Sequence, residues 1–218
     1  MKGDIVQLHG FFNSSTSYRV RIALALKGLA YDALPVNIRT GEHRDADYVA
    51  RVNPSALVPA LADGEFRLGQ SLAILDYLDQ IHPEPRLIPL EPRRRARVLE
   101  LATLIACDIH PVNNLRVLRY LDSELNVTPQ QKAAWYRHWI AEGMAGVERL
   151  LVRADTGPWC FGDTPTLADV CLVPQMANAL RMDCDLSAYP RSLAVYEHAR
   201  RAPAFEAAQP QRQPDYVA

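Results

Sequence analysis

Four consecutive hydroxyl side chains, Ser14 to Ser17, occur in the stretch FFNSSTSYRVRIAL, between an apolar run and a segment with helical apolar spacing. Serine and threonine are favoured at helix N-terminal caps, because their oxygens accept hydrogen bonds from unpaired first-turn amides. One cap does not require four hydroxyls. A helix N-terminus also attracts anions, and a hydroxyl that donates to a thiolate lowers the pKa of that thiol. The stretch contains no cysteine, so the thiol would belong to a ligand.

A proline interrupts the strand-like run LVPAL at residues 57–61. An X-Pro bond is the one context in which a cis peptide costs little, and proline breaks a strand's hydrogen-bond ladder. A cis bond between Val58 and Pro59 would turn the Val58 N–H and C=O toward an extended peptide ligand. An ordinary edge-strand proline is the alternative, and this feature taken alone favours that alternative.

Gln70 and Ser71 begin another helix-like segment in GQSLAIL. The start of that helix is a second place where an anion is stabilised, and a free carboxylate beside an α-amine suits it. Ser71 could instead act only as an N-terminal cap. Taken together, the thiolate site, the backbone clamp and the carboxylate site predict binding of a small thiol peptide such as glutathione.

The first 85 residues must position these groups, and they alternate short strand-like and helix-like segments in the order βαβαββα. Asp63-Gly64, between two short apolar runs, is a strong hairpin signal. This order predicts a compact α/β unit. Its expected elements are strands at 4–12 and 31–38, helices at 15–29 and 45–53, a hairpin at 58–69 and a helix at 71–83.

The remainder of the chain shows helical patterns only. A proline-rich stretch over 83–93 predicts a linker, and Pro111 predicts a kink in the first helix that follows. The polar, proline-rich end, APAFEAAQPQRQPDYVA, predicts a tail that lies on the surface. The expected helices span 94–125, 129–152, 166–180 and 191–200.

Charge and composition exclude several classes of protein. The chain has 218 residues and a formal net charge of −1, which gives no reason to expect nucleic acid or an anionic membrane as partner. No apolar run is long enough to cross a bilayer, and the N-terminal residues lack the apolar region of a signal peptide. The four cysteines form no CxxC pair and have no metal-ligand spacing, which predicts reduced thiols in a cytoplasmic protein and no metal site.

Nearly the whole chain resembles the zeta class of the glutathione transferases. The stretch SSTSYRVRIALALKG is similar to the zeta signature, in which Ser-Ser-Cys-Ser precedes an aromatic residue and Arg-Val-Arg. NPSALVPAL, QSLAILDYL and DTPTLADVCLVPQMANALR match the class in order and spacing. In the last of these, Thr166 and Asp169 form a predicted capping box, which we interpret as a folding element.

The resemblance implies a fold and an activity. The implied fold is an α/β thioredoxin-like, glutathione-binding domain at 1–85 followed by an all-α, substrate-binding domain at 92–218, usually assembled as a homodimer. The implied activity is glutathione-dependent cis–trans isomerisation of maleylacetoacetate, or of maleylpyruvate in a bacterial branch. Addition of the glutathione thiolate makes the double bond single, so that rotation and elimination release the trans isomer.

The resemblance also assigns roles to residues of the first domain. It implies that Ser14 and Ser15 contact the thiol, with Thr16 beside them in the catalytic group. The remaining glutathione contacts that it implies in this domain are Val58 and Pro59 for the cysteinyl backbone, Gln70 and Ser71 for the γ-glutamyl end, and His43, for which simple exposure to solvent is the alternative.

In the helical domain, the resemblance implies that His110 and Asn114 contact glutathione and that Asn113 contacts the diacid substrate. The alternative is a buried hydrogen-bonding set that supports the Pro111 kink. Arg181 matches the family arginine that holds a substrate carboxylate, and a surface ion pair is its alternative.

Two positions depart from the zeta pattern. Thr16 replaces the signature cysteine, so this residue cannot be a nucleophile, and reductive dehalogenation through a protein thiol is not expected. Asn13 replaces an arginine that commonly precedes the serines, which removes one possible contact with a substrate carboxylate. Two further functions therefore stay open: a general glutathione transferase acting on α-halo acids or other small electrophiles, and a non-catalytic binding module.

Overall fold

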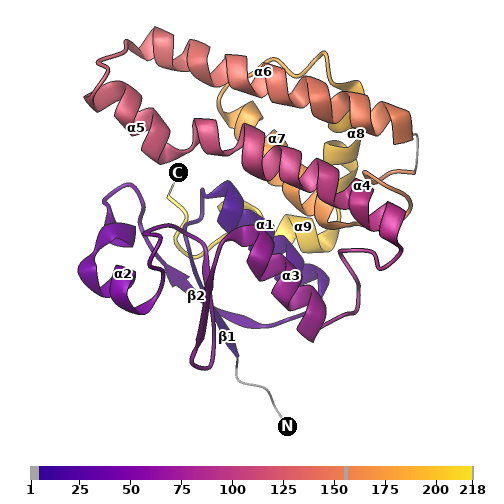
Figure 1. The fold of residues 1–218 in the computed structure, drawn as a ribbon, viewed down its shortest axis with the longest axis horizontal. Helices are drawn as coiled ribbons and strands as arrows, with labels where there is room; N and C mark the ends of the chain where they lie inside the picture. The colour runs from indigo at the N-terminus through magenta and orange to yellow at the C-terminus, as the bar shows by residue number, and fades with distance from the viewer. Residues whose placement is uncertain (1–4, 155–156, 218) are drawn as a thin grey trace. The chain divides into compact units, whose positions relative to one another are not determined.

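The computed structural model describes residues 5–154 and 157–217 of the chain. These residues form two compact units (Figure 1). Unit 1 comprises Met1–Leu87 together with Arg200–Ala218, and unit 2 comprises Ile88–Ala199. Unit 1 is therefore discontinuous in the sequence. No helix in the described ranges is both long and apolar enough to cross a membrane.

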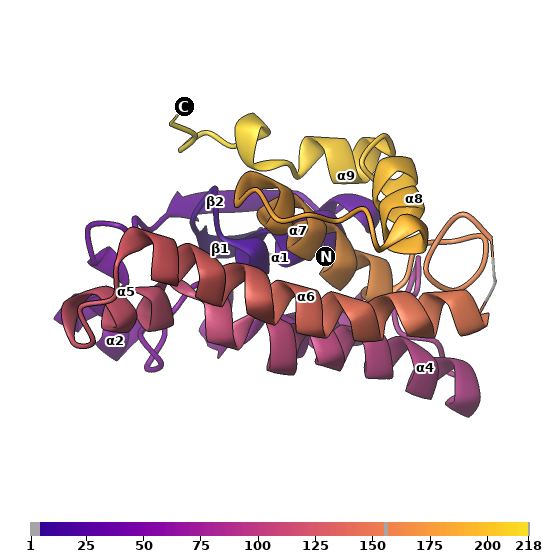
Figure 2. The same ribbon diagram turned by 90° about the horizontal axis from the view of Figure 1, so that it is seen from above.

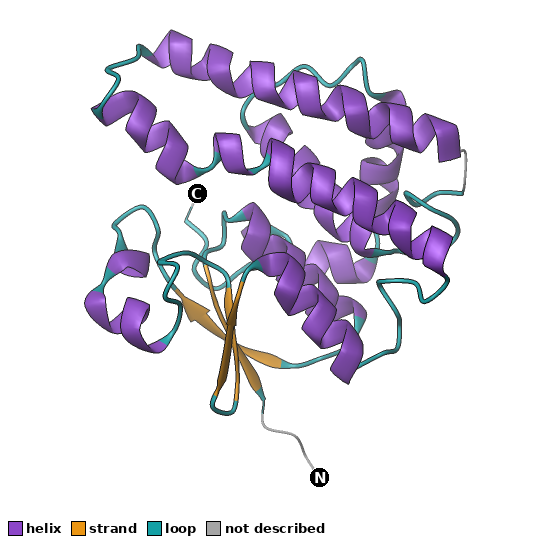
Figure 3. Cartoon of the chain, viewed as in Figure 1, coloured by secondary structure: helices purple, strands orange, loops and turns teal. Residues whose placement is uncertain are grey.

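Unit 1 is built on a four-stranded sheet with the strand order β2-β1-β3-β4. β1 and β2 are parallel, whereas β1 with β3 and β3 with β4 are antiparallel. Figure 3 shows α1 and α3 on one side of this sheet and α2 on the other. The predicted order βαβαββα is confirmed. The elements are β1 (Val6–Gly10), α1 (Ser15–Leu26), β2 (Tyr31–Pro35), the 3₁₀ helix η1 (Glu42–Arg44), α2 (Ala46–Arg51), β3 (Ala60–Asp63), β4 (Phe66–Gly69) and α3 (Ser71–Ile81).

Apolar side chains from the sheet and from two helices form the core of unit 1. Alternate residues of β1 point inward, because side chains alternate between the two faces of a strand. α1 and α3 contribute residues at helical spacing to the same cluster. The predicted hairpin is confirmed, and Gly64 takes the left-handed φ of 54° at its turn. The buried cluster contains Val6, Leu8, Val20, Leu24, Leu61, Ile74 and Leu78.

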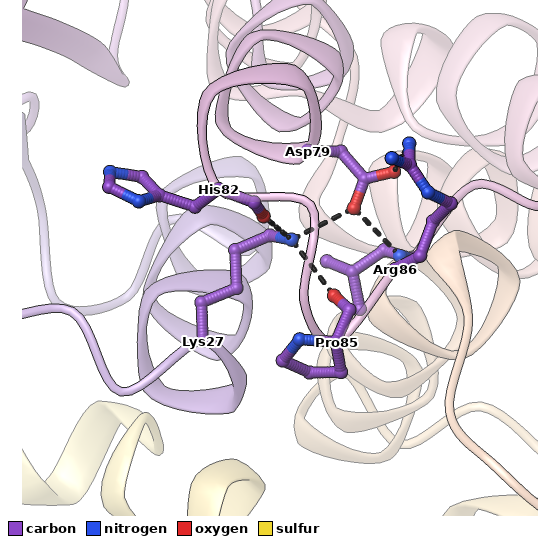
Figure 4. Close-up of polar contacts among 6 residues, drawn as sticks. Lys27, Asp79, His82, Pro85 and Arg86 are labelled. Carbon is purple, nitrogen blue, oxygen red and sulfur yellow. Dashed lines mark hydrogen bonds and ion pairs between the residues drawn. The ribbon is translucent and has the colours of Figure 1, made fainter.

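A buried ion pair joins the ends of α1 and α3 (Figure 4). The ammonium of Lys27 donates to Asp79 at 2.8 Å, and the side chains of both residues are fully buried. The same ammonium donates to the carbonyls of His82 and Pro85, and the Leu87 amide donates to Asp79. Lys27 thus satisfies carbonyl groups beyond the end of α3, where helices lack internal partners. These bonds hold the segment from the end of α3 to Leu87 against the end of α1.

Unit 2 contains helices and connecting segments. The expected helix over 94–125 is wrong as a single kinked element, because the structure divides this region into four helical segments. η2 continues α4 with π-helical hydrogen bonding and ends at Ile109, two residues before Pro111, which lacks the amide that a continuing helix would need. The segments are α4 (Pro92–Thr103), η2 (Leu104–Ile109), the 3₁₀ helix η3 (Pro111–Asn113) and α5 (Leu115–Ser123).

The later helices of unit 2 lie close to their predicted positions. α6 (Pro129–Ala154) is the longest helix of the unit, and Figure 2 shows α6 next to α4. α6 also contacts η2. Gly143 permits that contact, since a Cβ there would lie 2.2 Å from a side-chain carbon of Ile109. α7 (Leu167–Arg181) and α8 (Pro190–Ala199) follow, and the predicted capping box of Thr166 and Asp169 at the start of α7 is confirmed.

The end of the chain is not the surface tail that its composition predicts. It forms α9 (Pro203–Ala207) and the 3₁₀ helix η4 (Pro210–Arg212), and α9 packs against α1. The Phe205 side chain is completely buried, and the Tyr18 hydroxyl donates to the Phe205 carbonyl at 3.3 Å. A single buried aromatic anchors this segment, which a local pattern of prolines and polar residues does not reveal.

Candidate active site

The N-terminus of α1 is set by a turn and a cap. The Ser14 amide donates to the Phe11 carbonyl at 3.0 Å, which closes the turn before the helix. Ser14 is the N-terminal cap, and its hydroxyl oxygen accepts from the Ser17 amide at 3.2 Å. The prediction that one of the four hydroxyls caps this helix is confirmed.

The hydroxyl protons of Ser14 and Thr16 are used within the protein. Thr16 Oγ1 donates to the Val58 carbonyl at 3.2 Å, and the Ser14 and Thr16 hydroxyl oxygens lie 2.9 Å apart. A hydroxyl has one proton, so Ser14 is the donor to Thr16 when Thr16 donates to Val58. Ser14 and Thr16 therefore form a relay that ends on the backbone of Val58.

Ser15 is the uncommitted hydroxyl of the group. It is the first residue of α1 and is 8% exposed, and its hydroxyl has no hydrogen-bond partner in the part of the chain that the structure describes. The first-turn amides of Ser15 and Thr16 also point out of the helix without an internal acceptor. One hydroxyl proton and two amides thus stand together where the helix dipole favours negative charge.

The peptide bond between Val58 and Pro59 is cis, as the backbone-clamp hypothesis requires. Both residues precede β3, so Pro59 lies outside the strand and the edge-strand alternative is wrong. The preceding carbonyl, of Leu57, accepts hydrogen bonds of 2.8 Å from the Tyr48 hydroxyl and from Asn53 Nδ2. Tyr48 and Asn53 support this segment from α2 and the turn after it, and sequence reasoning did not identify them.

Ser71 does not cap α3, which corrects the capping interpretation. The N-terminal cap is Gln70, in a left-handed conformation with φ of 64° and without a side-chain capping bond. Ser71 is 6% exposed, and its oxygen instead accepts from Arg19 Nη1 at 3.2 Å. This bond brings α1 and the start of α3 together.

Arg19, on α1, is a buried cation. It is 1% exposed, and its Nε and Nη2 have no hydrogen-bond partner among the described residues. A buried guanidinium with unused donors is costly unless an anion compensates it. Arg19 therefore marks the N-terminus of α3 as a place where a carboxylate would be stabilised.

Two further predicted residues of unit 1 are placed as follows. His43 lies in η1 and is 6% exposed, so the solvent-exposed alternative is wrong. Asn13 immediately precedes the cap and is half-buried.

In unit 2, a hydrogen-bond network connects two of the predicted substrate residues. Asn113 Nδ2 donates to the Tyr136 carbonyl at 3.1 Å, and Asn178 Nδ2 donates to the Tyr136 hydroxyl at 2.6 Å. Arg181, which is exposed, donates to Asn178 Oδ1. Burial raises the pKa of Tyr136 to about 12, so its hydroxyl stays protonated at neutral pH. Tyr136 and Asn178 were not predicted. Tyr136 lies on α6, outside the quoted motifs, and Asn178 lies within the α7 motif, three residues before Arg181, but its bond to Tyr136 forms only on folding.

The polar residues around Pro111 have different local roles. Asn114 is the N-terminal cap of α5 and accepts from the Val117 amide, while His110 lies between η2 and η3. Asn113 is 6% exposed and its Oδ1 has no partner in the described ranges. The kink-support alternative thus accounts for Asn114 and for the Nδ2 of Asn113, and leaves one buried acceptor of Asn113 unused.

Comparison with known proteins identifies the family. The glutathione S-transferase N-terminal domain family matches residues 8–86. A probable maleylacetoacetate isomerase of Vibrio cholerae is 49% identical, over 95% of this chain and 97% of its own length. The holo structure of a bacterial zeta-class maleylpyruvate isomerase is 42% identical, with a TM-score of 0.94 and coverage of 97% of this chain and 100% of the other. A maleylacetoacetate isomerase of Methylobacterium extorquens, with bound malonate and glutathione, is 36% identical, with a TM-score of 0.93 and coverage of 97% and 100%. The chain therefore belongs to the zeta class of the glutathione transferases, the class of the maleylacetoacetate and maleylpyruvate isomerases.

Proposed function

We propose that this protein is a glutathione-dependent cis–trans isomerase of a maleyl-keto acid, converting maleylacetoacetate to fumarylacetoacetate or maleylpyruvate to fumarylpyruvate. The observation that carries the proposal is the donor-rich N-terminus of α1, which presents a free hydroxyl and two amides but no protein thiol. Such a site suits a reaction whose thiol is supplied by a cofactor and regenerated.

Glutathione is the cofactor, and three features of unit 1 fit its parts. The unused donors of Arg19, together with Ser71 and Gln70, suit the γ-glutamyl carboxylate. The backbone of Val58, next to the cis bond, suits the extended cysteinyl segment, with Pro59 and the buried His43 nearby in the proposed contact set. When bound, glutathione supplies the thiolate that adds to the double bond and leaves after rotation.

The residues of this chain hold and stabilise that reacting group. Ser15 donates its hydroxyl proton to the sulfur, because the protons of Ser14 and Thr16 are spent in the relay to Val58. The amides of Ser15 and Thr16 and the positive end of the helix dipole favour the thiolate over the thiol. Ser14 and Thr16 hold the first turn in place for this bond.

The helical unit supplies the proposed grip on the diacid. Arg181 offers a guanidinium to one carboxylate, and Asn178 and Tyr136 fix its orientation. Asn113 belongs to the same network through Tyr136 and contributes a substrate contact. His110 and Asn114 are proposed as glutathione contacts from this unit. Asn13 is neutral where the family pattern has an arginine, so the carboxylate grip depends on Arg181.

The test is the loss of absorbance of maleylacetoacetate and of maleylpyruvate, each with and without glutathione. Rapid conversion of either compound only when glutathione is present would establish the isomerase and identify its substrate. If glutathione binds but neither compound is converted, the activity is instead that of a general transferase. The next assay is then conjugation of glutathione to an α-halo acid, with Asn13→Arg as the matched variant.

We also infer from the family that the protein acts as a homodimer in the cytoplasm. Light scattering coupled to size-exclusion chromatography would give twice the 24.4 kDa chain mass for a dimer. A mass equal to one chain would contradict the inference.

A further inference from the structure

The C-terminal strap, which we define as residues 203–216, contacts the loop at Phe11 and Phe12, directly before the hydroxyl residues at the start of α1. The Asp215 carboxylate accepts from the Phe12 amide at 2.9 Å, two residues before the cap of α1. The Tyr216 ring meets the Phe12 ring edge to face, with centroids 5.4 Å apart. The strap therefore touches the backbone and the side chain of the same loop residue.

Arg21 connects the strap to the loop from the inner side. Its Nη2 donates to the Phe12 carbonyl at 3.0 Å, its Nη1 donates to the Phe11 carbonyl at 3.4 Å, and its Nε donates to the Ala208 carbonyl at 3.0 Å. The residue is 4% exposed. Burial lowers the pKa of Arg21 to about 10, which leaves the guanidinium charged at neutral pH.

The loop atoms held in this way are the ones that fix the start of α1. The Phe11 carbonyl accepts from Arg21 and also from the Ser14 amide, so it closes the turn that places the cap. Both backbone polar groups of Phe12 are held, the amide by Asp215 and the carbonyl by Arg21. A shift of this loop would move Ser14 and Ser15 with it.

Accordingly, we propose that Asp215 is a positioning residue, which together with Arg21 holds the Phe11–Phe12 loop so that the Ser15 hydroxyl meets the reacting sulfur. The inference rests on the proposed function for the identity of that sulfur. Asp215 does not touch the cofactor in this proposal. It acts through the Phe12 amide, and a displacement of about 1 Å at a reacting group is enough to cost about 100-fold in rate.

The experiment compares Asp215→Ala and Asp215→Asn with Glu206→Gln. Glu206 lies in the same strap, and its ion pair with Arg212 is exposed, so its replacement is a matched control. The first readout is backbone hydrogen exchange of residues 11–17. The second is the pH titration of the bound glutathione thiol by its ultraviolet absorbance, and the third is the division of any rate change between kcat and KM.

For Asp215→Ala we expect faster hydrogen exchange in residues 11–17 and a glutathione thiol that titrates at higher pH. We also expect kcat to fall about tenfold, less than the roughly 100-fold loss that a displacement of about 1 Å can cause. Asp215→Asn keeps an acceptor oxygen and should fall between Asp215→Ala and the wild type. Glu206→Gln should match the wild type. Unchanged exchange or an unchanged thiol titration in Asp215→Ala overturns the inference, and so does an equal effect of Glu206→Gln.

Asp215→Asn covers the case in which Asp215→Ala fails to fold, because it keeps an acceptor oxygen and loses only the charge. Its exchange and titration changes should be smaller and in the same direction, and their absence would overturn the inference. The exchange and titration readouts need glutathione but no maleyl-keto acid. If the wild type binds glutathione as thiolate and isomerises neither acid, the proposed function fails while the positioning role of Asp215 is still decided.

Discussion

At the scale of single residues, Ser14, Ser15 and Thr16 differ in whether their hydroxyl protons are available to a ligand. Ser15→Ala removes the free donor, and removal of one such donor typically lowers the rate by about 10²- to 10³-fold. Thr16→Ala removes the bond to the Val58 carbonyl and the acceptor of the Ser14 hydroxyl, but no donor to the sulfur, so we expect a smaller loss. Steady-state kcat with the isomerised substrate measures both variants. The reverse ranking would show that Thr16 donates to the sulfur.

Replacement of Arg19 should affect glutathione affinity and the free energy of unfolding differently. Arg19→Met replaces a buried, partly unpaired cation with an apolar chain of similar length, so the free energy of unfolding should be unchanged or higher. Affinity for glutathione should fall about tenfold, since a hydrogen bond to a charged group contributes about 1.5–3 kcal/mol and Arg19 acts partly through Ser71. Calorimetric titration and urea unfolding measure the two effects. Loss of stability with unchanged affinity would make Arg19 a purely structural residue.

At the scale of elements, the ion pair between Lys27 and Asp79 holds the ends of α1 and α3. Asp79→Ala leaves the buried Lys27 ammonium and the Leu87 amide without this carboxylate, and loss of one partner of a buried pair costs about 3–5 kcal/mol. The urea midpoint should fall accordingly. The exposed pair of Asp47 and Arg51 provides the control, because Asp47→Ala should change stability by less than about 1 kcal/mol. Equal effects of the two variants would contradict this account.

Prediction from sequence succeeded for elements whose signals are local. The cap of α1, the hairpin at Gly64 and the capping box of Thr166 and Asp169 each depend on a few adjacent residues, and all three are present. The π-helical turn η2 has no such local signal, and it packs against α6, where Gly143 faces Ile109. The single helix expected over 94–125 was wrong because η2 and the breaks at Pro111 and Asn114 divide it.

The residues of the site divide in the same way. Ser14, Val58 and Ser71 are recognisable from short motifs. In contrast, Arg19, which donates to Ser71, and Tyr48 and Asn53, which donate to the Leu57 carbonyl, become relevant only after folding. The burial of Phe205 against α1 likewise joins segments from opposite ends of the chain, and no local pattern could reveal it. The roles of the predicted ligand residues stay predictions until the variants above are measured.

At the scale of the whole molecule, the cysteines differ in reactivity. Cys107 is exposed, while Cys160 and Cys171 are completely buried. Burial raises the pKa of the Cys160 thiol well above its usual value, and burial also raises that of Cys184, so neither forms a thiolate readily near neutral pH. Brief treatment with iodoacetamide should therefore add one group, at Cys107, as read by peptide mass spectrometry. Denatured protein should add four, and early labelling of Cys160 would contradict the buried placement.

Because unit 1 is discontinuous in the sequence, it cannot be completed during translation until residues 200–218 have been synthesised. Residues 1–87 are made first, but their partners at 200–218 follow only after the entire helical unit has been translated. At about 5–20 residues per second, that delay is on the order of ten seconds. During this interval the loop at Phe11 and Phe12 lacks both the Ala208 carbonyl and the Asp215 carboxylate. We expect the nascent chain to form its sheet early and to order the loop at Phe11 and Phe12 last, after residues 208–215 have been synthesised.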